Sequence, residues 1–189
     1  MKKRQTNKLV KSAKRTAPAR KPAKAARPAA KTTPAGPPSV TPYLVVKGAD
    51  RAMDFYKRAF GARERMRMPG PDGKTVMHAE LTIGSSTVYM SDEFPDMGPG
   101  PRSPETLHGT TTTLHLGVPD VDAAFKRAVE AGAQVRMAPA DMFWGDRYAK
   151  VSDPFGHEWG MSTPKEKLTP QQLKKRAEQF FAQMGKPQG

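Results

Sequence analysis

The sequence contains one short pattern twice, and this repeat limits the folds open to the chain. Lys-Arg-Ala occurs at 57–59 and at 126–128, and each copy is followed by Gly-Ala, at 61–62 and at 132–133. One shared tripeptide could be a coincidence. However, each copy also closes a stretch of helical periodicity that follows a run typical of a strand, and further strand-like runs come after it. The sequence therefore predicts an internal duplication of a β-α-β-β-β unit.

In the first copy, residues 43–47 form an apolar run typical of a strand, and Asp50 stands where a helix N-cap is expected. Apolar residues then recur at helical spacing until Gly61, which ends the helix. These apolar positions are Ala52, Phe55, Tyr56, Ala59 and Phe60. Three further strands are predicted at 62–68, 76–83 and 87–91.

The second copy follows the same order. It has a strand at 110–118 and a helix that Asp120 caps and Gly132 ends. The apolar face of this helix is made by Val121, Ala124, Phe125, Ala128 and Val129. Strands are then predicted at 133–137, 147–151 and 158–161, with Asp-Pro-Phe-Gly at 153–156 as the turn before the last one. The sequence thus predicts an α+β fold of two tandem modules.

Several motifs resemble one known family. Asp-Phe-Tyr at 54–56, the helix end Phe60-Gly61 and the closing Asp-Pro-Phe-Gly-His at 153–157 are similar to motifs of the vicinal-oxygen-chelate superfamily of glyoxalases, extradiol dioxygenases and bleomycin or fosfomycin resistance proteins. Phe-Trp-Gly-Asp-Arg-Tyr at 143–148 is similar to the PhnB-like branch. The resemblance covers residues 41–162 and implies that the two modules form a concave half-barrel. It does not fix a reaction, because one fold hosts several chemistries and plain binding proteins.

The N-terminal segment 1–38 differs from the rest in composition. It holds eight Lys, four Arg and no acidic residue, so it carries +12 of the formal net charge of +14, whereas the remainder carries +2. We expect this Lys/Ala/Pro-rich tail to be disordered, the glyoxalase-like domain to span 39–164, and an amphipathic helix to occupy 165–189. The basic residues include Lys2, Lys3, Arg4, Lys11, Lys14, Arg15, Arg20, Lys21, Lys24 and Arg27.

A flexible polycation attracts phosphate backbones without reading their sequence, so the tail predicts non-specific nucleic-acid binding and would allow association with a nucleoid. A solubilising extension and an organellar transit peptide are the alternatives. The chain has no cysteine, which excludes disulfides, thiolate metal sites and a cysteine nucleophile. No apolar run is long enough to cross a bilayer and no secretory signal is present, so we expect a cytoplasmic protein with no membrane partner.

The C-terminal segment predicts a helix that begins at Thr169-Pro170 with a capping box. Its apolar face consists of Leu173, Ala177, Phe180, Phe181 and Met184. Such a helix packs on its own domain or across a dimer. Because the two modules leave sheet edges and the superfamily resembled often dimerises, we expect a homodimer.

Side-chain alternation separates two faces on each predicted strand. The face turned away from the helices is polar and includes His78, Glu80, His115 and Glu158. For His78 and Glu80, plain solvent exposure is the competing interpretation, and for His115 it is a satisfied, partly buried histidine. Residues 144–148 add aromatic rings and an arginine, a mixture that suits a flat organic ligand with an anionic group.

The resemblance also implies places for metal ligands, and this sequence departs from the family there. Those places fall near Thr41, between Tyr89 and Ser91, near Thr113 and at Gly160, and none carries a customary ligand. We therefore predict no metal and no cofactor. A displaced divalent-metal site using His78, Glu80 and His115 is the alternative.

Three functional hypotheses follow. The first is a binding protein for a small organic molecule, without the family's metal site. The second is a glyoxalase-like or dioxygenase-like lyase or oxidoreductase with atypical ligands, in which His115 and Glu80 are the catalytic candidates. The third is a protein tethered to nucleic acid through its tail. The predicted ligand-binding residues are Tyr43, His78, Thr113, Trp144, Arg147, Tyr148 and Glu158.

Overall fold

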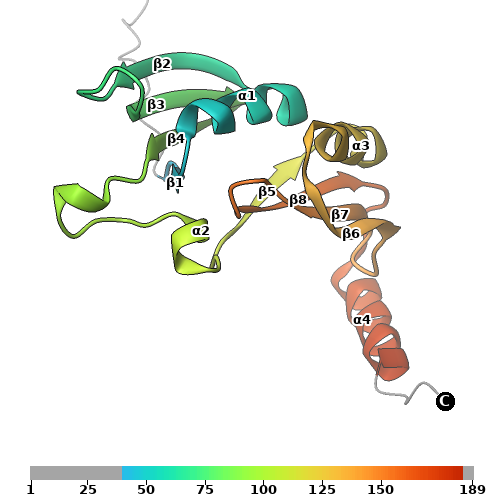
Figure 1. Cartoon of the computed structure of the whole chain (residues 1–189). Helices are drawn as coiled ribbons and strands as arrows, with labels where there is room; N and C mark the ends of the chain where they lie inside the picture. The colour runs from blue at the N-terminus through green and yellow to red at the C-terminus, as the bar shows by residue number, and fades with distance from the viewer. Residues whose placement is uncertain (1–39, 185–189) are drawn as a thin grey trace, which may run out of the picture. The chain divides into compact units, whose positions relative to one another are not determined.

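The structure is a computed structural model that describes residues 40–184 of the chain. Residues 1–39 and 185–189 are outside the described part, so the predicted basic tail at 1–38 lies outside it. Figure 1 traces the described elements in chain order. The described residues include no helix that is both long enough and apolar enough to cross a membrane.

The described chain folds into two modules with the same plan, which confirms the α+β fold. The first has the sheet order β1-β4-β3-β2 and the second β5-β8-β7-β6, and in each the first strand runs parallel to the last. The first module contains β1 (Tyr43–Val46), α1 (Ala49–Phe60), β2 (Arg63–Pro69), β3 (Val76–Ile83) and β4 (Ser86–Asp92). The second contains β5 (Thr113–Gly117), α3 (Val121–Ala131), β6 (Gln134–Asp141), β7 (Asp146–Ser152) and β8 (Glu158–Pro164).

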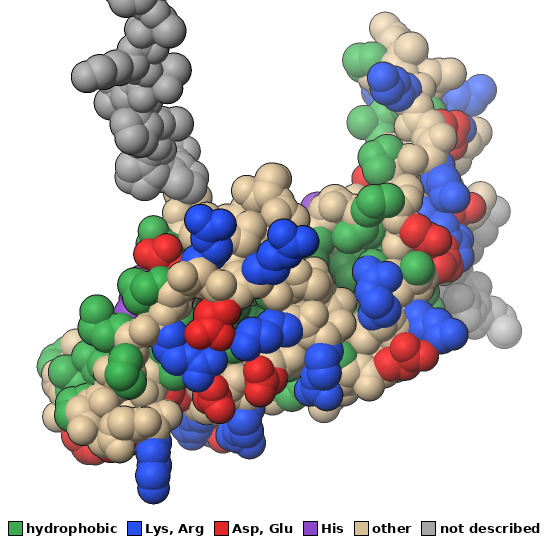
Figure 2. Space-filling model, turned by 90° about the horizontal axis from the view of Figure 1, so that it is seen from above, with side chains coloured by type: hydrophobic (Ala, Val, Ile, Leu, Met, Phe, Trp, Pro, Cys, Tyr) green, Lys and Arg blue, Asp and Glu red, His purple; other side chains and the backbone are tan. Residues whose placement is uncertain are grey.

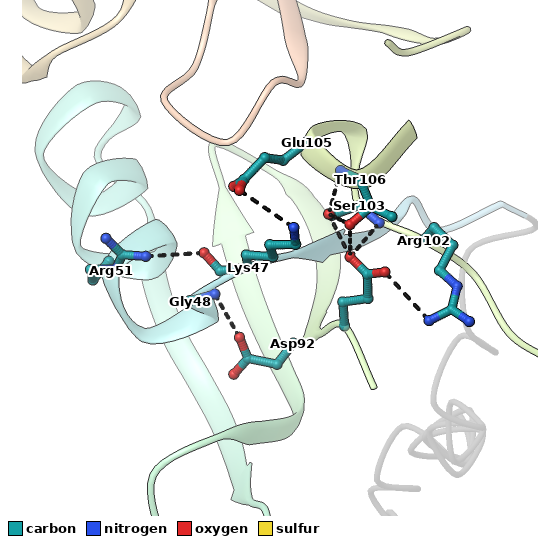
Figure 3. A network of polar contacts seen from close by, with 9 residues as sticks. Lys47, Gly48, Arg51, Asp92, Arg102, Ser103, Glu105 and Thr106 are labelled. Carbon is teal, nitrogen blue, oxygen red and sulfur yellow. Dashed lines mark hydrogen bonds and ion pairs between the residues drawn. The ribbon is translucent and has the colours of Figure 1, made fainter. Parts of the chain in front are cut away.

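The two principal helices begin in different ways. Asp120 caps α3 as predicted, because its side chain accepts a 3.0 Å hydrogen bond from the amide of Ala123. The prediction that Asp50 caps α1 is wrong, since Gly48 occupies the N-cap position with a positive φ of 92°. Asp92, at the end of β4, accepts a hydrogen bond from the amide of Gly48 (2.7 Å; Figure 3). It also accepts one from the amide of Ala49 (2.8 Å). A distant side chain therefore satisfies the free amides of α1.

The modules share a core in which α1 packs against α3. Phe55, Tyr56 and Trp159 are among its largest fully or almost fully buried side chains. The rings of Tyr56 and Trp159 lie 5.3 Å apart, so a helix of the first module contacts a strand of the second. Burial of each such side chain contributes about 1.5 to 3 kcal/mol, which makes this core the main link between the modules.

A connection formed by residues 93–112 links the two sheets. It contains the 3₁₀ turn η1 (Pro95–Met97) and the single-turn helix α2 (Pro104–Leu107), neither of which the sequence predicted. The hydroxyls of Ser103 (2.6 Å) and Thr106 (2.7 Å) donate to the almost buried carboxylate of Glu93 and lower its pKa to about 2 (Figure 3). The connection is therefore fastened to the end of β4.

The predicted C-terminal helix is present as α4 (Pro170–Met184). It begins with the expected capping box, in which the amide of Thr169 donates to Gln172 (2.8 Å) and the amide of Gln172 donates back to the Thr169 hydroxyl (3.3 Å). None of its fifteen residues is buried. The shared core consequently forms without α4.

Candidate functional site

The face of the first sheet turned away from α1 carries a cluster of half-exposed rings. The Tyr43 hydroxyl lies 2.9 Å from Nδ1 of His78, and the rings of these residues and of Tyr89 lie 5.0 to 6.0 Å from one another. Nε2 of His78 is 3.7 Å from the carboxylate of Glu80. The structure thus brings three predicted residues, Tyr43, His78 and Glu80, onto one polar and aromatic face.

Two adjoining hollows lie beside this face, one of about 330 Å³ and one of about 350 Å³. Both are lined by Tyr43, Val45 and Pro101. Their remaining walls come largely from the connection between the modules, including Phe94 and Leu107. Volumes of this size suit a small organic ligand. The sequence predicts none of these wall residues, because residues 94–107 show no strand or helix periodicity.

His157, the last residue of the turn motif, also lines one hollow. Its Nε2 atom lies 3.3 Å from the backbone oxygen of Val45 in β1, so it contacts the first module from the second. Burial lowers the pKa of His157 below its ordinary value. Its neutral form is favoured there, and its position indicates a structural contact between the modules.

The corresponding face of the second sheet carries His115 and Tyr148. Their rings are nearly parallel, at 10°, with centroids 6.0 Å apart, and Nε2 of His115 lies 3.0 Å from the hydroxyl of Ser162. Both rings lie over Gly160: a Cβ atom there would stand 2.7 Å from the Tyr148 hydroxyl and 3.2 Å from Nδ1 of His115. The place where the family resemblance puts a metal ligand therefore lies against two rings.

Glu158 lies on the same face, two residues before Gly160 and opposite Thr113 on β5. Its carboxylate forms an ion pair with Lys150 and approaches the guanidinium of Arg136 at 3.9 Å. The charge of Glu158 is therefore balanced by neighbouring side chains. Thr113 and Glu158 form the end of this face, beyond the rings.

Arg147 is held away from this face. Its guanidinium donates to both carboxylate oxygens of Asp122 on α3, at 2.6 and 2.8 Å, and to Asp141 at 3.1 Å. These hydrogen bonds raise the pKa of Arg147 above its ordinary value. Because alternate residues of a strand point to opposite faces, Arg147 lies on the helix side of β7 and Tyr148 on the open side. The ring of Trp144 lies beside that of Tyr148, with 5.8 Å between the ring centroids.

The residues of these two faces do not match a metal centre of the usual kind. The described residues contain no group of three His, Cys, Asp or Glu side chains that could hold an ion. His78 and Glu80 belong to the first sheet and His115 to the second, and strand pairing does not bring them together. A catalytic divalent ion needs about three protein ligands around one point. The side chains of residues 40–184 in one chain do not gather three such ligands around one point.

Both sheets have the same strand order. Each sheet has one helix on one face and a polar, aromatic surface on the other. These features define a protein of paired β-α-β-β-β modules. A family model described as the glyoxalase, bleomycin resistance protein and dioxygenase superfamily matches residues 37–161, and the chain belongs to that superfamily.

Three known proteins show what the chain is similar to. An uncharacterised protein of Mycobacterium tuberculosis, Rv0887c, is 51% identical over 128 residues, which are 67% of this chain and 75% of that protein. The crystal structure of TioX from Micromonospora sp. ML1 superposes with a TM-score of 0.53 at 29% identity and covers 66% of this chain and 97% of TioX. The PhnB protein of Bacillus cereus shares the fold, with a TM-score of 0.51 at 16% identity over 66% of this chain and 98% of its own.

Proposed function

We propose that this protein binds a small organic molecule in a cleft without the metal centre of its enzymatic relatives. The cleft lies between the open face of one β1-β4-β3-β2 sheet and the open face of one β5-β8-β7-β6 sheet. The observation that carries this proposal is the ring pair of His115 and Tyr148 over Gly160. Rings in that place offer a stacking surface where a metal ligand would otherwise point.

The cleft in this proposal is completed by a second copy of the chain. Within the described residues, β1 pairs only with β4 and β5 only with β8, so each sheet has a free edge beside its open face. Tyr43, on the edge strand β1, is 49% exposed. Free edges with half-exposed rings favour pairing with another chain. We propose a homodimer in which the Tyr43 and His78 face of one copy meets the His115 and Tyr148 face of the other.

The decisive experiment combines ligand screening with a measurement of oligomeric state. Small aromatic acids, thiol conjugates and aromatic antibiotics are screened by thermal shift against the purified full chain, since a bound ligand raises the melting temperature with its saturation. We expect hits that are lost in Tyr43→Ala and in Tyr148→Ala, and kept in Tyr89→Phe. Sedimentation should show a dimer. A monomer that binds normally would overturn the shared cleft, and hits unaffected by both alanine variants would overturn the site.

A metal-dependent lyase or oxidoreductase is the second candidate, favoured by the proximity of His78 and Glu80 at 3.7 Å. In a dimer these side chains would face His115 of the other copy. Metal analysis of protein purified without added ions separates the two candidates. One tightly bound divalent ion per chain, lost in Glu80→Ala and kept in the control Glu105→Ala, would establish the metal site and overturn the metal-free proposal.

A further inference from the structure

A second pair of adjoining hollows lies at the end of α1 and shares no lining residue with the pair beside Tyr43. Their volumes are about 350 Å³ and about 390 Å³, and both are lined by Phe60 and Gly84. The smaller hollow lies between the modules, because its other walls come from the turn between β3 and β4 and from β5, β8 and α3, with His115 among them. Either volume suits a small organic ligand.

Three arginines line these hollows, which we call the arginine hollows. Arg63 and Arg65 of β2 line the larger one, and Arg127 of α3 lines the smaller one. No described Asp or Glu lines either of them. Residues 40–184 contain 19 Lys and Arg against 18 Asp and Glu, so the described part as a whole is nearly neutral. The positive charge of the arginine hollows is therefore local, and it favours an anionic ligand.

The three guanidinium groups form no hydrogen bond or ion pair within residues 40–184. By contrast, Arg67 binds Asp50 (2.5 Å) on α1. Arg147 likewise binds Asp122 (2.6 Å) on α3. A guanidinium group carries five N–H donors in a planar fork that matches the oxygens of carboxylates and phosphates. In the arginine hollows these donors are available to a ligand.

Strand β2 turns its acidic residue away from the arginine hollows. Glu64 pairs with Lys57 of α1 (3.0 Å) and with Arg67 (2.9 Å), so it lies on the helix side of the sheet. Adjacent residues of a strand point to opposite faces, and Arg63 and Arg65 therefore point to the open side. The pairing register shifts after Glu64, and this bulge places Arg67 on the side of Glu64. The strand thus separates two unpaired arginines from its paired charges.

We propose that the arginine hollows are a second ligand site, beyond the proposed cleft, and that this site binds a small organic phosphate. A phosphate ester carries up to about two negative charges at neutral pH, so it balances several guanidinium groups better than a carboxylate does. Thr82 and Ser86 line the same hollows and supply hydroxyl donors for the remaining oxygens. The organic part of the ligand packs on apolar walls of the smaller hollow, which Phe60, Leu116 and Val118 provide.

The test uses phenyl phosphate, inorganic phosphate and benzoate, whose dissociation constants are measured by calorimetry on the full chain at one salt concentration. Phenyl phosphate carries both a ring and a phosphate group, and it should bind more tightly than the two probes that lack one of these. In Arg65→Gln and in Arg127→Gln, phenyl phosphate should bind about tenfold more weakly, since each variant loses a charge-assisted hydrogen bond. Both arginines are exposed, so the melting temperature without ligand should be unchanged.

Arg58→Gln is the matched control. Arg58 is an exposed arginine of α1 that donates to the backbone oxygen of Asp54 (3.4 Å) and lines neither arginine hollow. The control removes the same charge and should leave the affinity for phenyl phosphate unchanged. Attraction of the probes to the basic residues 1–38 is common to all these variants, so it cancels in the comparison.

Four results would overturn the second site and leave the proposed cleft intact. The first is an equal loss in Arg58→Gln and Arg65→Gln, which would indicate only general attraction of charge. The second is equal affinity for phenyl phosphate and inorganic phosphate, which would contradict an organic ligand. The third is the absence of measurable phenyl phosphate binding. The fourth is loss of phenyl phosphate binding in Tyr148→Ala with full binding in both arginine variants, which would place this ligand in the cleft.

Discussion

The hydroxyl of Tyr56 on α1 donates a 2.6 Å hydrogen bond to the carboxylate of Asp153 in the turn before β8. Asp153 also accepts a 3.0 Å hydrogen bond from the indole of Trp159, and all three side chains are buried. One carboxylate thus joins a helix of the first module to a turn and a strand of the second. The aspartate of the Asp-Pro-Phe-Gly motif is a structural residue in this chain.

Replacing Asp153 by alanine should destabilise the protein more than replacing Tyr56 by phenylalanine. Tyr56→Phe removes one hydrogen bond, at a cost of about 1 to 3 kcal/mol. Asp153→Ala also leaves the Trp159 indole and the amides of Phe155 and His157 without their acceptor, so we expect a loss of about 3 to 5 kcal/mol. Urea unfolding measures both. Asp54→Ala, at an exposed position on α1, is the control, and equal losses in the two test variants would contradict the prediction.

The same contact predicts a loss of stability at alkaline pH. Burial, reinforced by the negative charge of Asp153, raises the pKa of Tyr56 well above its ordinary value of 10.0. Above that pH the unfolded chain has released the tyrosine proton while the folded chain still binds it, so the stability present at lower pH declines as the pH rises. The free energy of unfolding measured from pH 8 to 11 should fall more steeply in the wild type than in Tyr56→Phe. Parallel curves would show that Tyr56 does not contribute.

Gly160→Ala should weaken ligand binding with little loss of stability. The added methyl group would meet the flexible end of Tyr148 at 2.7 Å, and the ring can swing away while the strand remains paired. We expect an unfolding free energy within about 1.5 kcal/mol of the wild type, together with reduced thermal-shift responses to cleft ligands. Gly109→Ala, where nothing lies within 4 Å of the added carbon, is the matched control for stability alone, because Gly109 lines one of the hollows. Full ligand response in Gly160→Ala would contradict the proposed stacking surface.

Nucleic-acid binding, if it occurs through residues 1–38, should depend steeply on salt. That segment carries +12, whereas acidic and basic side chains are interspersed on the face of the described part shown in Figure 2. Elsewhere in the described part, ion pairs such as Lys57–Glu64 (3.0 Å) and Arg67–Asp50 (2.5 Å) also place opposite charges together. Deleting 1–38 should abolish DNA retardation, and the log-log salt slope of the full chain should be about 0.9 per phosphate neutralised. Equal retardation of both chains would refute the role of the tail.

The duplicated β-α-β-β-β plan could be predicted from sequence because it depends on local periodicity and on a repeated helix ending. The start of α1 could not. Asp50 has a suitable residue type and position, but the acceptor is Asp92, 43 residues after Ala49 in the chain. Local rules for helix ends do not register a partner supplied by a distant strand.

The candidate site could likewise be predicted only in part from the sequence. Alternation along β3 predicts that His78 and Glu80 share a face, and the structure has them together. His115 is predicted on the corresponding face of the second module, where it lies 3.0 Å from Ser162. The sequence predicts Arg147 beside Tyr148 in the ligand site, and this is not what the structure has. Adjacent strand residues point to opposite faces, and Arg147 binds Asp122 on the helix side. The hollows beside Tyr43 depend on how the connection between the modules folds, which has no periodic signal.

The acceptor role of Asp92 has a consequence for the order of folding. The first amides of α1 find their partner only after β4 has been placed in the sheet, and the same carboxylate accepts a 2.7 Å hydrogen bond from the amide of Val76 at the start of β3. A nascent chain that has been synthesised only as far as β3 would contain the residues of α1 but leave the beginning of that helix frayed. The first turn of α1 therefore becomes stable only when all strands of the first sheet are in place.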